Sequence, residues 1–247
     1  MREILADLVA EQQGLDQSLQ RAPDRDWKKP TGKGRWTVKD TIAYLAWTEH
    51  AAASVLTGAR TVKQVLADYG GDLDGFIDAG LEEGRTKRPQ EVIEWWRFGR
   101  ADVVDALSRT RGEDRIDWIV GDVTARTFAT ARLADTWAHM LDIFHCLEKE
   151  IEDTPRLRHI AHLGWATLPY TFEQADRDYP EPIRVELVGP GYARWVYGPE
   201  ESLQKVRGQA GDWCRLVVNR IGAAEAESLL VEGDLATDAL EIASVFP

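Results

Sequence analysis

The sequence predicts an α+β protein, with an N-terminal bundle of amphipathic helices followed by a small mixed C-terminal domain. Two patterns support this class. Apolar residues recur at helical spacing through most of the first 172 residues, whereas apolar and polar residues alternate at strand spacing after Pro180. We therefore expect two domains, residues 1–172 and 173–247, the first an antiparallel four-helix bundle.

The first two helices are expected on either side of a polar loop over residues 26–36. Apolar residues at helical spacing mark the first helix and end near Pro23. Thr37 is placed to cap the second helix, with Asp40 in the third position of a capping box. This helix should continue through His50 into the alanines that follow.

Two further long helices complete the expected bundle. The third should span residues 89–108, and the fourth should carry the segment 132–146. The acidic stretch between the second and third helices, residues 68–83, is expected to be a solvated loop.

The C-terminal domain should contain one hairpin, one further strand and flanking helices. A helix around residues 158–165 should lead into it, and glycine and proline mark its turns. The expected elements are strands at 183–187 and 195–197, a helix at 210–221, a strand at 229–231 and a helix at 235–242.

Composition narrows the classes of function. The formal net charge of −12 argues against binding to nucleic acid or to anionic lipid. Two cysteines make no disulfide framework, and no apolar run is long enough to span a membrane. We therefore expect a cytoplasmic protein that acts on a small molecule, with its oligomeric state open and a homodimer among the options.

The densest chemistry lies in the expected fourth helix. Asp135, His139 and Asp142 follow one another at spacings of four and three residues, which places them on one helical face. A carboxylate and an imidazole on one face can hold a divalent metal or move a proton. A third ligand would have to come from a neighbouring helix, where Glu49 and His50 are the conventional donors. A buried hydrogen bond between helices would explain the same pattern.

The remaining histidines and cysteines carry weaker signals. His145 and Cys146 are adjacent on a helix and so do not face each other, which favours an ordinary thiol and a surface imidazole. His159 and His162 share a face without a carboxylate beside them, so we expect packing or supporting roles.

Two motifs then resemble a known family. The segment Trp36-Thr-Val-Lys-Asp40-x-Ile-Ala-x-Leu-Ala46 resembles the entry to the second helix of the DinB-like superfamily. The segment from Ala131 to Asp142 resembles the fourth-helix motif of the mycothiol-dependent maleylpyruvate isomerase family, where Glu-x-x-x-His supplies two metal ligands. In the tail, Trp195-x-Tyr-Gly-Pro-Glu200 and Gly208-x-Ala-x-Asp-x-Cys214 resemble a C-terminal domain labelled wyosine base formation, a small α/β domain of sterol-carrier-like fold.

The resemblance implies a thiol S-transferase or isomerase that holds zinc or another divalent ion with three protein ligands and uses a thiol such as mycothiol. The sequence departs from this pattern at two ligands. Tyr44 stands where the family has a histidine, and the shorter Asp135 replaces a glutamate.

These departures favour a small-molecule enzyme with a degenerate metal site. His139, Asp135 and Tyr44 would then catalyse an acid–base isomerisation, elimination or cyclisation in specialised metabolism, without a metal cofactor. One alternative is a metal-dependent thiol transferase or isomerase, with the ion on Asp135 and His139. A second alternative is a non-catalytic ligand-binding protein.

The same pocket should hold the substrate. The side chains expected to line it come from the second and fourth helices: Trp47, His50, Trp137 and Asp142.

Overall fold

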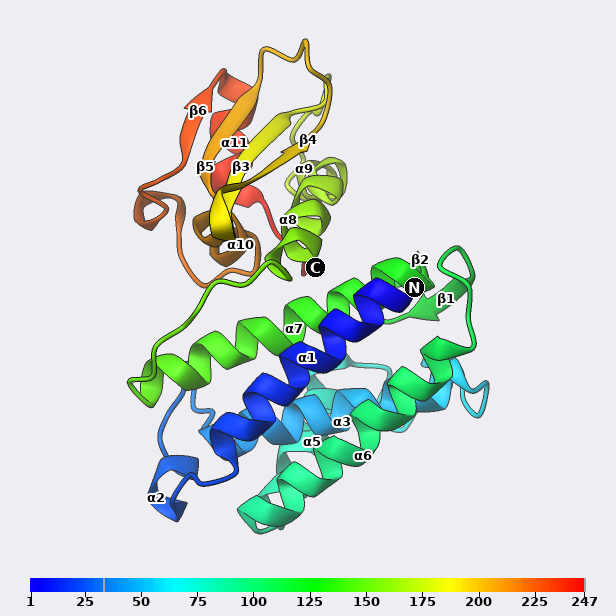
Figure 1. Cartoon of the computed structure of the whole chain (residues 1–247). Coiled ribbons are helices and arrows are strands. Elements are labelled where there is room, and N and C mark those ends of the chain that lie inside the picture. The colour runs from blue at the N-terminus through cyan, green and yellow to red at the C-terminus, as the bar shows by residue number, and fades with distance from the viewer. Residues whose placement is uncertain (33, 247) are drawn as a thin grey trace. The chain divides into compact units, whose positions relative to one another are not determined.

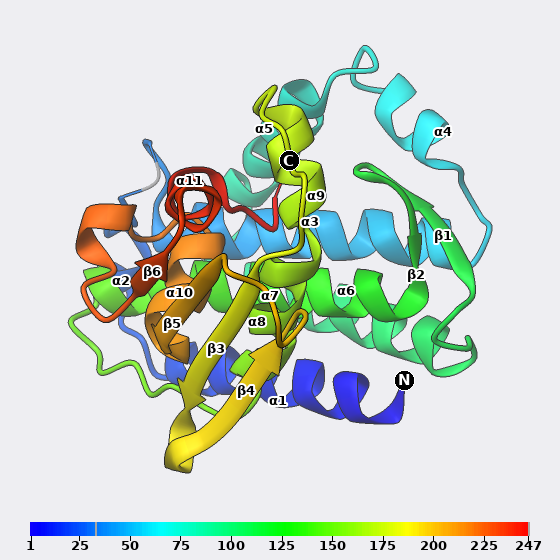
Figure 2. The ribbon, with the colours of Figure 1, turned by 90° about the horizontal axis from the view of Figure 1, so that it is seen from above.

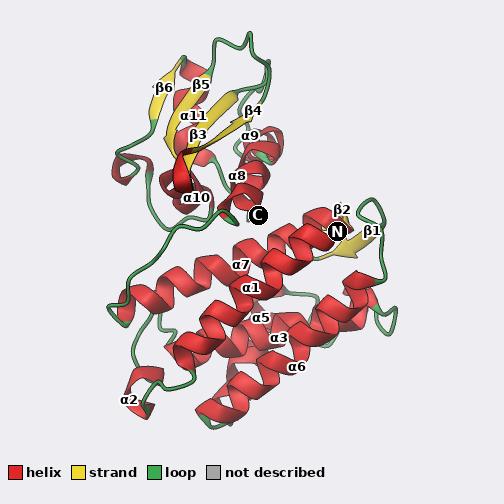
Figure 3. Ribbon diagram, viewed as in Figure 1, coloured by secondary structure: helices red, strands yellow, loops and turns green. Residues whose placement is uncertain are grey.

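The computed structural model describes residues 1–32 and 34–246. They form two compact units, one ending at Glu150 and the next starting at Ile151 (Figure 1). The first unit is almost entirely helical and the second combines helices with a four-stranded sheet (Figure 3). The predicted α+β class, with its helical N-terminal domain, is confirmed.

Four long helices build the first unit, as predicted (Figure 1). Their bounds are α1 (Arg2–Leu19), α3 (Val38–Leu56), α6 (Pro89–Ser108) and α7 (Ala125–Cys146). The predicted capping box starts α3, because Thr37 Oγ1 accepts from the Asp40 amide while Asp40 Oδ2 accepts from the Thr37 amide. Most residues of α7 are buried. The buried residues include a row of polar side chains along one face of the helix.

The prediction of a solvated loop over residues 68–83 is wrong. After the short helices α2 (Asp24–Trp27) and α4 (Val62–Ala67), most of this stretch forms α5 (Leu73–Arg85), which packs on α3 (Figure 2). Phe76 and Leu81 of α5 are buried, and the Phe76 ring centroid lies 5.6 Å from that of Trp47 on α3. Gly80 lets the helices approach closely, since a Cβ at this position would overlap the indole of Trp47.

A two-stranded hairpin, β1 (Arg115–Trp118) and β2 (Gly121–Thr124), leads into α7 and was not predicted. Its turn uses Gly121 at a φ of +100°. The Trp118 ring meets Phe128 of α7 edge-on, with ring centroids 5.4 Å apart. The hairpin therefore anchors the start of the helix that carries the candidate site.

The second unit is built on a sheet with strand order β4-β3-β5-β6 (Figure 2). The predicted hairpin is present, with β3 and β4 antiparallel on either side of a 3-10 turn, whereas β3 and β5 are parallel. The predicted helix from Ala210 ends early, at Val217, because Asn219 takes a left-handed conformation with φ +58°. The elements are α8 (Leu157–Ala166), α9 (Leu168–Gln174), β3 (Arg184–Gly189), β4 (Ala193–Tyr197), β5 (Lys205–Gln209), α10 (Ala210–Val217), β6 (Leu230–Glu232) and α11 (Asp234–Ile242).

The second unit begins before α8, earlier than the predicted boundary at residue 172. Aromatic side chains tie α8 to the sheet and to α10. Trp213 Nε1 donates to the Ala161 carbonyl over 3.1 Å, and Trp165 Nε1 donates to the Ile183 carbonyl over 2.9 Å. These bonds join α8 to α10 and to the residue before β3, so α8 belongs to the second unit.

Within the described residues, no helix is both long enough and apolar enough to cross a membrane.

Candidate active site

The candidate site is a row of polar side chains along the buried helix α7. Thr124 caps this helix by accepting from the Thr127 amide over 3.1 Å. Helical spacing then brings four charged or titratable side chains onto one face, all of them buried. They are Arg132, Asp135, His139 and Asp142.

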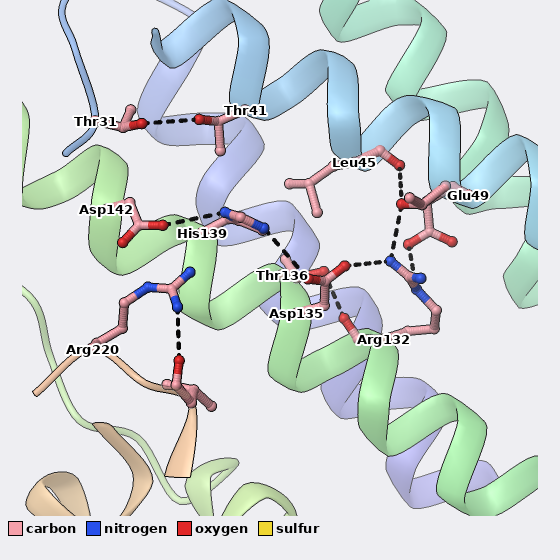
Figure 4. A network of polar contacts seen from close by, with 12 residues as sticks. Thr31, Thr41, Leu45, Glu49, Arg132, Asp135, Thr136, His139, Asp142 and Arg220 are labelled. Atoms are coloured by element: carbon pink, nitrogen blue, oxygen red, sulfur yellow. Dashed lines mark hydrogen bonds and ion pairs between the residues drawn. The ribbon is translucent and has the colours of Figure 1, made fainter. Parts of the chain in front are cut away.

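His139 lies between two carboxylates of its own helix (Figure 4). Its Nδ1 is hydrogen-bonded to Asp142 Oδ2 over 3.2 Å, and its Nε2 lies 3.5 Å from Asp135 Oδ1. Because an ionised carboxylate only accepts, Nδ1 is the donor toward Asp142. Asp142 therefore fixes the orientation of the ring and directs Nε2 toward Asp135. The structure brings this predicted trio together.

Two aromatic side chains border the imidazole. The Tyr44 ring, on α3, meets His139 edge-on with centroids 4.9 Å apart, and Trp36 lies nearly parallel to His139 at 6.0 Å. Trp36 and Tyr44 also contact each other, with centroids 5.2 Å apart. Both are only partly buried, whereas His139 is 7% exposed. The imidazole therefore lies beneath a rim of aromatic side chains, with Tyr44 where the sequence placed it.

A buried ion network continues from Asp135 into the bundle (Figure 4). Arg132 Nη2 donates to Asp135 Oδ2 over 2.6 Å and lies 3.2 Å from Thr48 Oγ1. Arg132 Nε lies 3.5 Å from Glu49 Oε1, which accepts from Gln12 Nε2 over 3.3 Å. The network thus joins α7 to α3 and α1.

Burial shifts the protonation equilibria of this network. Burial raises the pKa of Glu49 above its ordinary value, and the nearby Asp135 adds to the rise, while Arg132 opposes it. For Arg132, burial acts to lower the pKa, but the carboxylates of Glu49 and Asp135 outweigh it and the pKa is raised. Arg132 is therefore a fixed positive charge beside Asp135.

Two of the predicted pocket residues, Trp47 and His50, contact aromatic residues of the bundle and the Trp95 carbonyl. Trp47 packs against Tyr69 and Phe76, with ring centroids 5.7 and 5.6 Å away. His50 Nε2 is hydrogen-bonded to the Trp95 carbonyl over 3.0 Å. At about 100° per residue, His50 is turned about 240° round the helix from Tyr44, whereas Trp47 is displaced by only about 60°. Trp47 and His50 therefore face α5 and α6.

Trp137 is also separated from the reactive face, although it is buried as expected of a core residue. It lies two residues from both Asp135 and His139, which places it about 200° round α7 from each of them. Its predicted role in holding substrate rests on the sequence alone.

Sequence reasoning gave no role to three residues that the structure places at the site: Arg132, Thr48 and Trp36. A signal for Arg132 was available, because it precedes Asp135 by three residues and opposite charges at that spacing pair on a helix. Trp36 lies in a loop just before the capping box, and residue spacing in a loop does not show where a side chain points.

Cys146 offers no activated nucleophile, in keeping with the sequence expectation. Burial raises the pKa of its thiol, and Sγ donates to the Ile143 carbonyl over 3.2 Å. His145 beside it is exposed.

The side chains at the site do not fit a three-ligand divalent centre. Among the described residues, no group of three or more His, Cys, Asp or Glu side chains is arranged to hold a metal ion. A phenol, Tyr44, stands next to His139, and one oxygen of Asp135 is held by the Arg132 guanidinium. Zinc centres in proteins are built from thiolate, imidazole and carboxylate donors, so the phenol of Tyr44 is not a conventional third ligand.

Solved structures share this architecture. The crystal structure of the mycothiol-dependent maleylpyruvate isomerase superposes with a TM-score of 0.62 at 16% identity, over 93% of this chain and 92% of that one. A single-substitution mutant of that enzyme gives a TM-score of 0.63 at 17% identity, with the same coverage. At these identities the match establishes the fold.

Sequence comparisons identify the family as well as the fold. The uncharacterized protein Rv0036c of Mycobacterium tuberculosis H37Rv is 35% identical over 217 residues, which cover 87% of this chain and 84% of that protein. The uncharacterized protein MT0041 of strain CDC 1551 matches equally well. Residues 8–144 match the family described as mycothiol maleylpyruvate isomerase N-terminal domain. The match covers most of the bundle, including the row of polar residues on α7, and the chain belongs to this family.

Proposed function

We propose that this protein is a small-molecule isomerase that uses a low-molecular-weight thiol and performs acid–base chemistry at a degenerate metal site. The observation that carries the proposal is the placement of His139 between two carboxylates, beneath the rim of Trp36 and Tyr44. A base that is oriented by a carboxylate and is close to a phenol suits proton transfer to and from a bound substrate.

In the proposed mechanism His139 moves the proton. Asp142 accepts from Nδ1 and holds the ring, so that Nε2 is the nitrogen that exchanges a proton with substrate. Asp135, 3.5 Å from Nε2, stabilises the positive charge that develops on the imidazole when Nε2 takes up a proton. Both carboxylates are buried, and this strengthens their effect on the ring.

Tyr44 is the second proton-transfer group in this proposal. Its ring contacts His139, and its hydroxyl can donate to an oxygen that gains charge during the reaction. Trp36 provides a flat apolar surface beside both rings, which would exclude water from one side of a bound substrate.

We include a thiol in the proposal because the name of the related enzymes states that they depend on mycothiol. A thiol supplies a sulfur that adds to an electrophilic carbon and later leaves, which permits rotation about a former double bond. The residues named above would hold the substrate and move protons. A cis–trans isomerisation is therefore favoured over elimination or cyclisation.

The proposal treats the metal as dispensable, and the donor set supports this. Asp135 has a cation on one oxygen, Arg132, and the neighbour on α3 is the phenol of Tyr44. The positive charge that a divalent ion would bring to the carboxylate is already provided by a fixed guanidinium.

The test is isomerisation of maleylpyruvate, the substrate in the name of the structural neighbours, with mycothiol, glutathione or no thiol. We expect thiol-dependent turnover by protein treated with a chelator. His139→Gln should lower kcat by about 10²- to 10⁴-fold, the usual contribution of a general acid–base group. His145→Gln is the matched control, since His145 is exposed on the same helix.

Two results would contradict the proposal. Turnover that appears only when zinc is added back would favour the metal-dependent thiol transferase or isomerase. Ligand binding without turnover across a panel of activated alkenes would favour a non-catalytic ligand-binding protein.

A further inference from the structure

The buried cluster formed by Arg132, Glu49 and Thr48 has no part in the proton transfers described above. None of the three touches His139 in the polar contacts of the described chain, and yet all are buried in the core of the bundle. We propose that this cluster is a positioning device that aims the Asp135 carboxylate at Nε2 of His139.

The geometry fixes the guanidinium from two helices. On α7, Arg132 Nη2 donates to Asp135 Oδ2 over 2.6 Å. On α3, the same nitrogen donates to Thr48 Oγ1 over 3.2 Å, and Nε lies 3.5 Å from Glu49 Oε1. A planar guanidinium held at several points has little freedom to rotate. One oxygen of Asp135 is thereby fixed, and its other oxygen is turned toward His139.

Glu49 is itself held from a third helix. Its Oε1 accepts from Gln12 Nε2 of α1 over 3.3 Å, and its side chain is fully buried. On the opposite side, Gly99 of α6 allows close approach, since a Cβ there would lie 3.0 Å from Glu49 Cβ. The position of Asp135 therefore depends on contacts that extend through the whole bundle.

Stability alone does not account for such a cluster. Removing ions from water costs several kcal/mol per ion, by order of magnitude, and well-packed apolar residues of similar volume are often at least as stable. In the described part of the chain, Glu49 Oε2 and Arg132 Nε have no hydrogen-bond partner, which adds to the cost. A charged cluster that is expensive to bury and is joined to the candidate catalytic carboxylate fits a positioning role.

The inference rests on the proposed function, in which Asp135 and His139 act as a pair, but its test does not need turnover. Protein carrying ¹⁵N-histidine gives side-chain signals from five histidines, and His139→Gln identifies those of residue 139. At fixed pH, we expect Glu49→Gln and Thr48→Val to move the His139 nitrogen signals by several linewidths. The signals of His145, His159 and His162 should stay in place, whereas His50 adjoins Glu49 in the chain and does not serve as a reference.

Arg97→Met is the matched control. Arg97 pairs with Asp16 between α6 and α1, so the variant breaks a partly buried ion pair of the same bundle away from Asp135. Its His139 signals should match those of the wild type. Circular dichroism establishes that each variant is folded, and Thr48→Val, which removes a single hydroxyl, keeps the test available if Glu49→Gln fails to fold.

Unchanged His139 signals in the folded variants would overturn the positioning role, as would an equal shift in Arg97→Met. Where turnover is found, Thr48→Val should lower kcat with little change in KM, and the Glu49 variant should lose about 10- to 100-fold, as when an orienting group is removed. Shifted signals without turnover would refute the proposed function and leave the positioning role standing.

Discussion

Arg132 Nη2 lies 2.6 Å from Asp135 Oδ2, one turn along the same helix, and both side chains are buried. A carboxylate that lies 3.5 Å from His139 is thus bound to a permanent cation in the core of the bundle. Glu49 and Gln12 extend this contact to two more helices. The contacts that hold Asp135 therefore also join three helices of the bundle.

The first prediction concerns stability. Arg132→Met should lower the free energy of unfolding by about 3–5 kcal/mol, because it leaves two buried carboxylates without their cation. Denaturation by urea measures the change. Arg109→Met is the control, since Arg109 pairs with Asp105 on the exposed surface of α6 and should contribute no more than about 1 kcal/mol. Equal effects of the two variants would contradict the prediction.

The second prediction is a pH dependence. Burial raises the folded-state pKa of Glu49 above its ordinary value of 4.5. As the pH rises from about 4.5 to that raised pKa, the unfolded chain loses this proton while the folded chain keeps it. The wild type should therefore lose stability relative to Glu49→Gln as the pH rises through this window. Urea denaturation at a series of pH values measures the difference, and a difference that does not vary with pH would refute it.

The third prediction concerns the metal. Tyr44→His combined with Asp135→Glu gives the chain the three donors that the family motif implies, on α3 and α7. We expect this double variant to bind about one equivalent of zinc, as three imidazole or carboxylate ligands suffice for a zinc centre. Elemental analysis after dialysis gives the stoichiometry.

The wild type treated in the same way should retain less zinc than the double variant. His50→Gln, introduced into the double variant, is the control, because His50 is bonded to the Trp95 carbonyl and should not contribute. Zinc bound tightly by the wild type would contradict the idea of a degenerate site.

The fourth prediction contrasts two helical glycines. Gly80→Ala should destabilise the protein by about 1–3 kcal/mol, because the new Cβ would overlap the Trp47 ring and force α5 away from α3. Gly14→Ala should stabilise it by up to about 1 kcal/mol, since no atom lies within 4 Å of a Cβ there and alanine favours the helix. Thermal and urea denaturation compare the pair. Destabilisation by both would show that the close approach of α5 is not the cause.

The bundle could be predicted because its signals are local. The capping box at Thr37 and Asp40, the helical spacing of apolar residues and the Asp135–His139–Asp142 face are all set by residues a turn or two apart. The structure reproduces them because the same short-range geometry governs the folded helix.

The parts that escaped prediction depend on distant partners. The acidic residues of segment 68–83 suggest solvent, but Phe76 is buried where α5 meets α3, and Gly80 lies against the Trp47 side chain. The packing partners of Trp47 and His50 come from α5 and α6 in the same way. Spacing along one helix shows which residues share a face, but not which neighbour covers that face.

The tight contact of α5 with α3 affects which substitutions α3 can accept in evolution. On one side of α3, Trp47 packs against Gly80 of α5. On another side, Tyr44 and Thr48 contact the row of polar residues on α7. Since one surface of α3 packs against α5 and another meets the polar row of α7, the residue at position 44 can change without disturbing the contact between α3 and α5. Such a helix allows a lineage to acquire new reactions while its architecture stays the same.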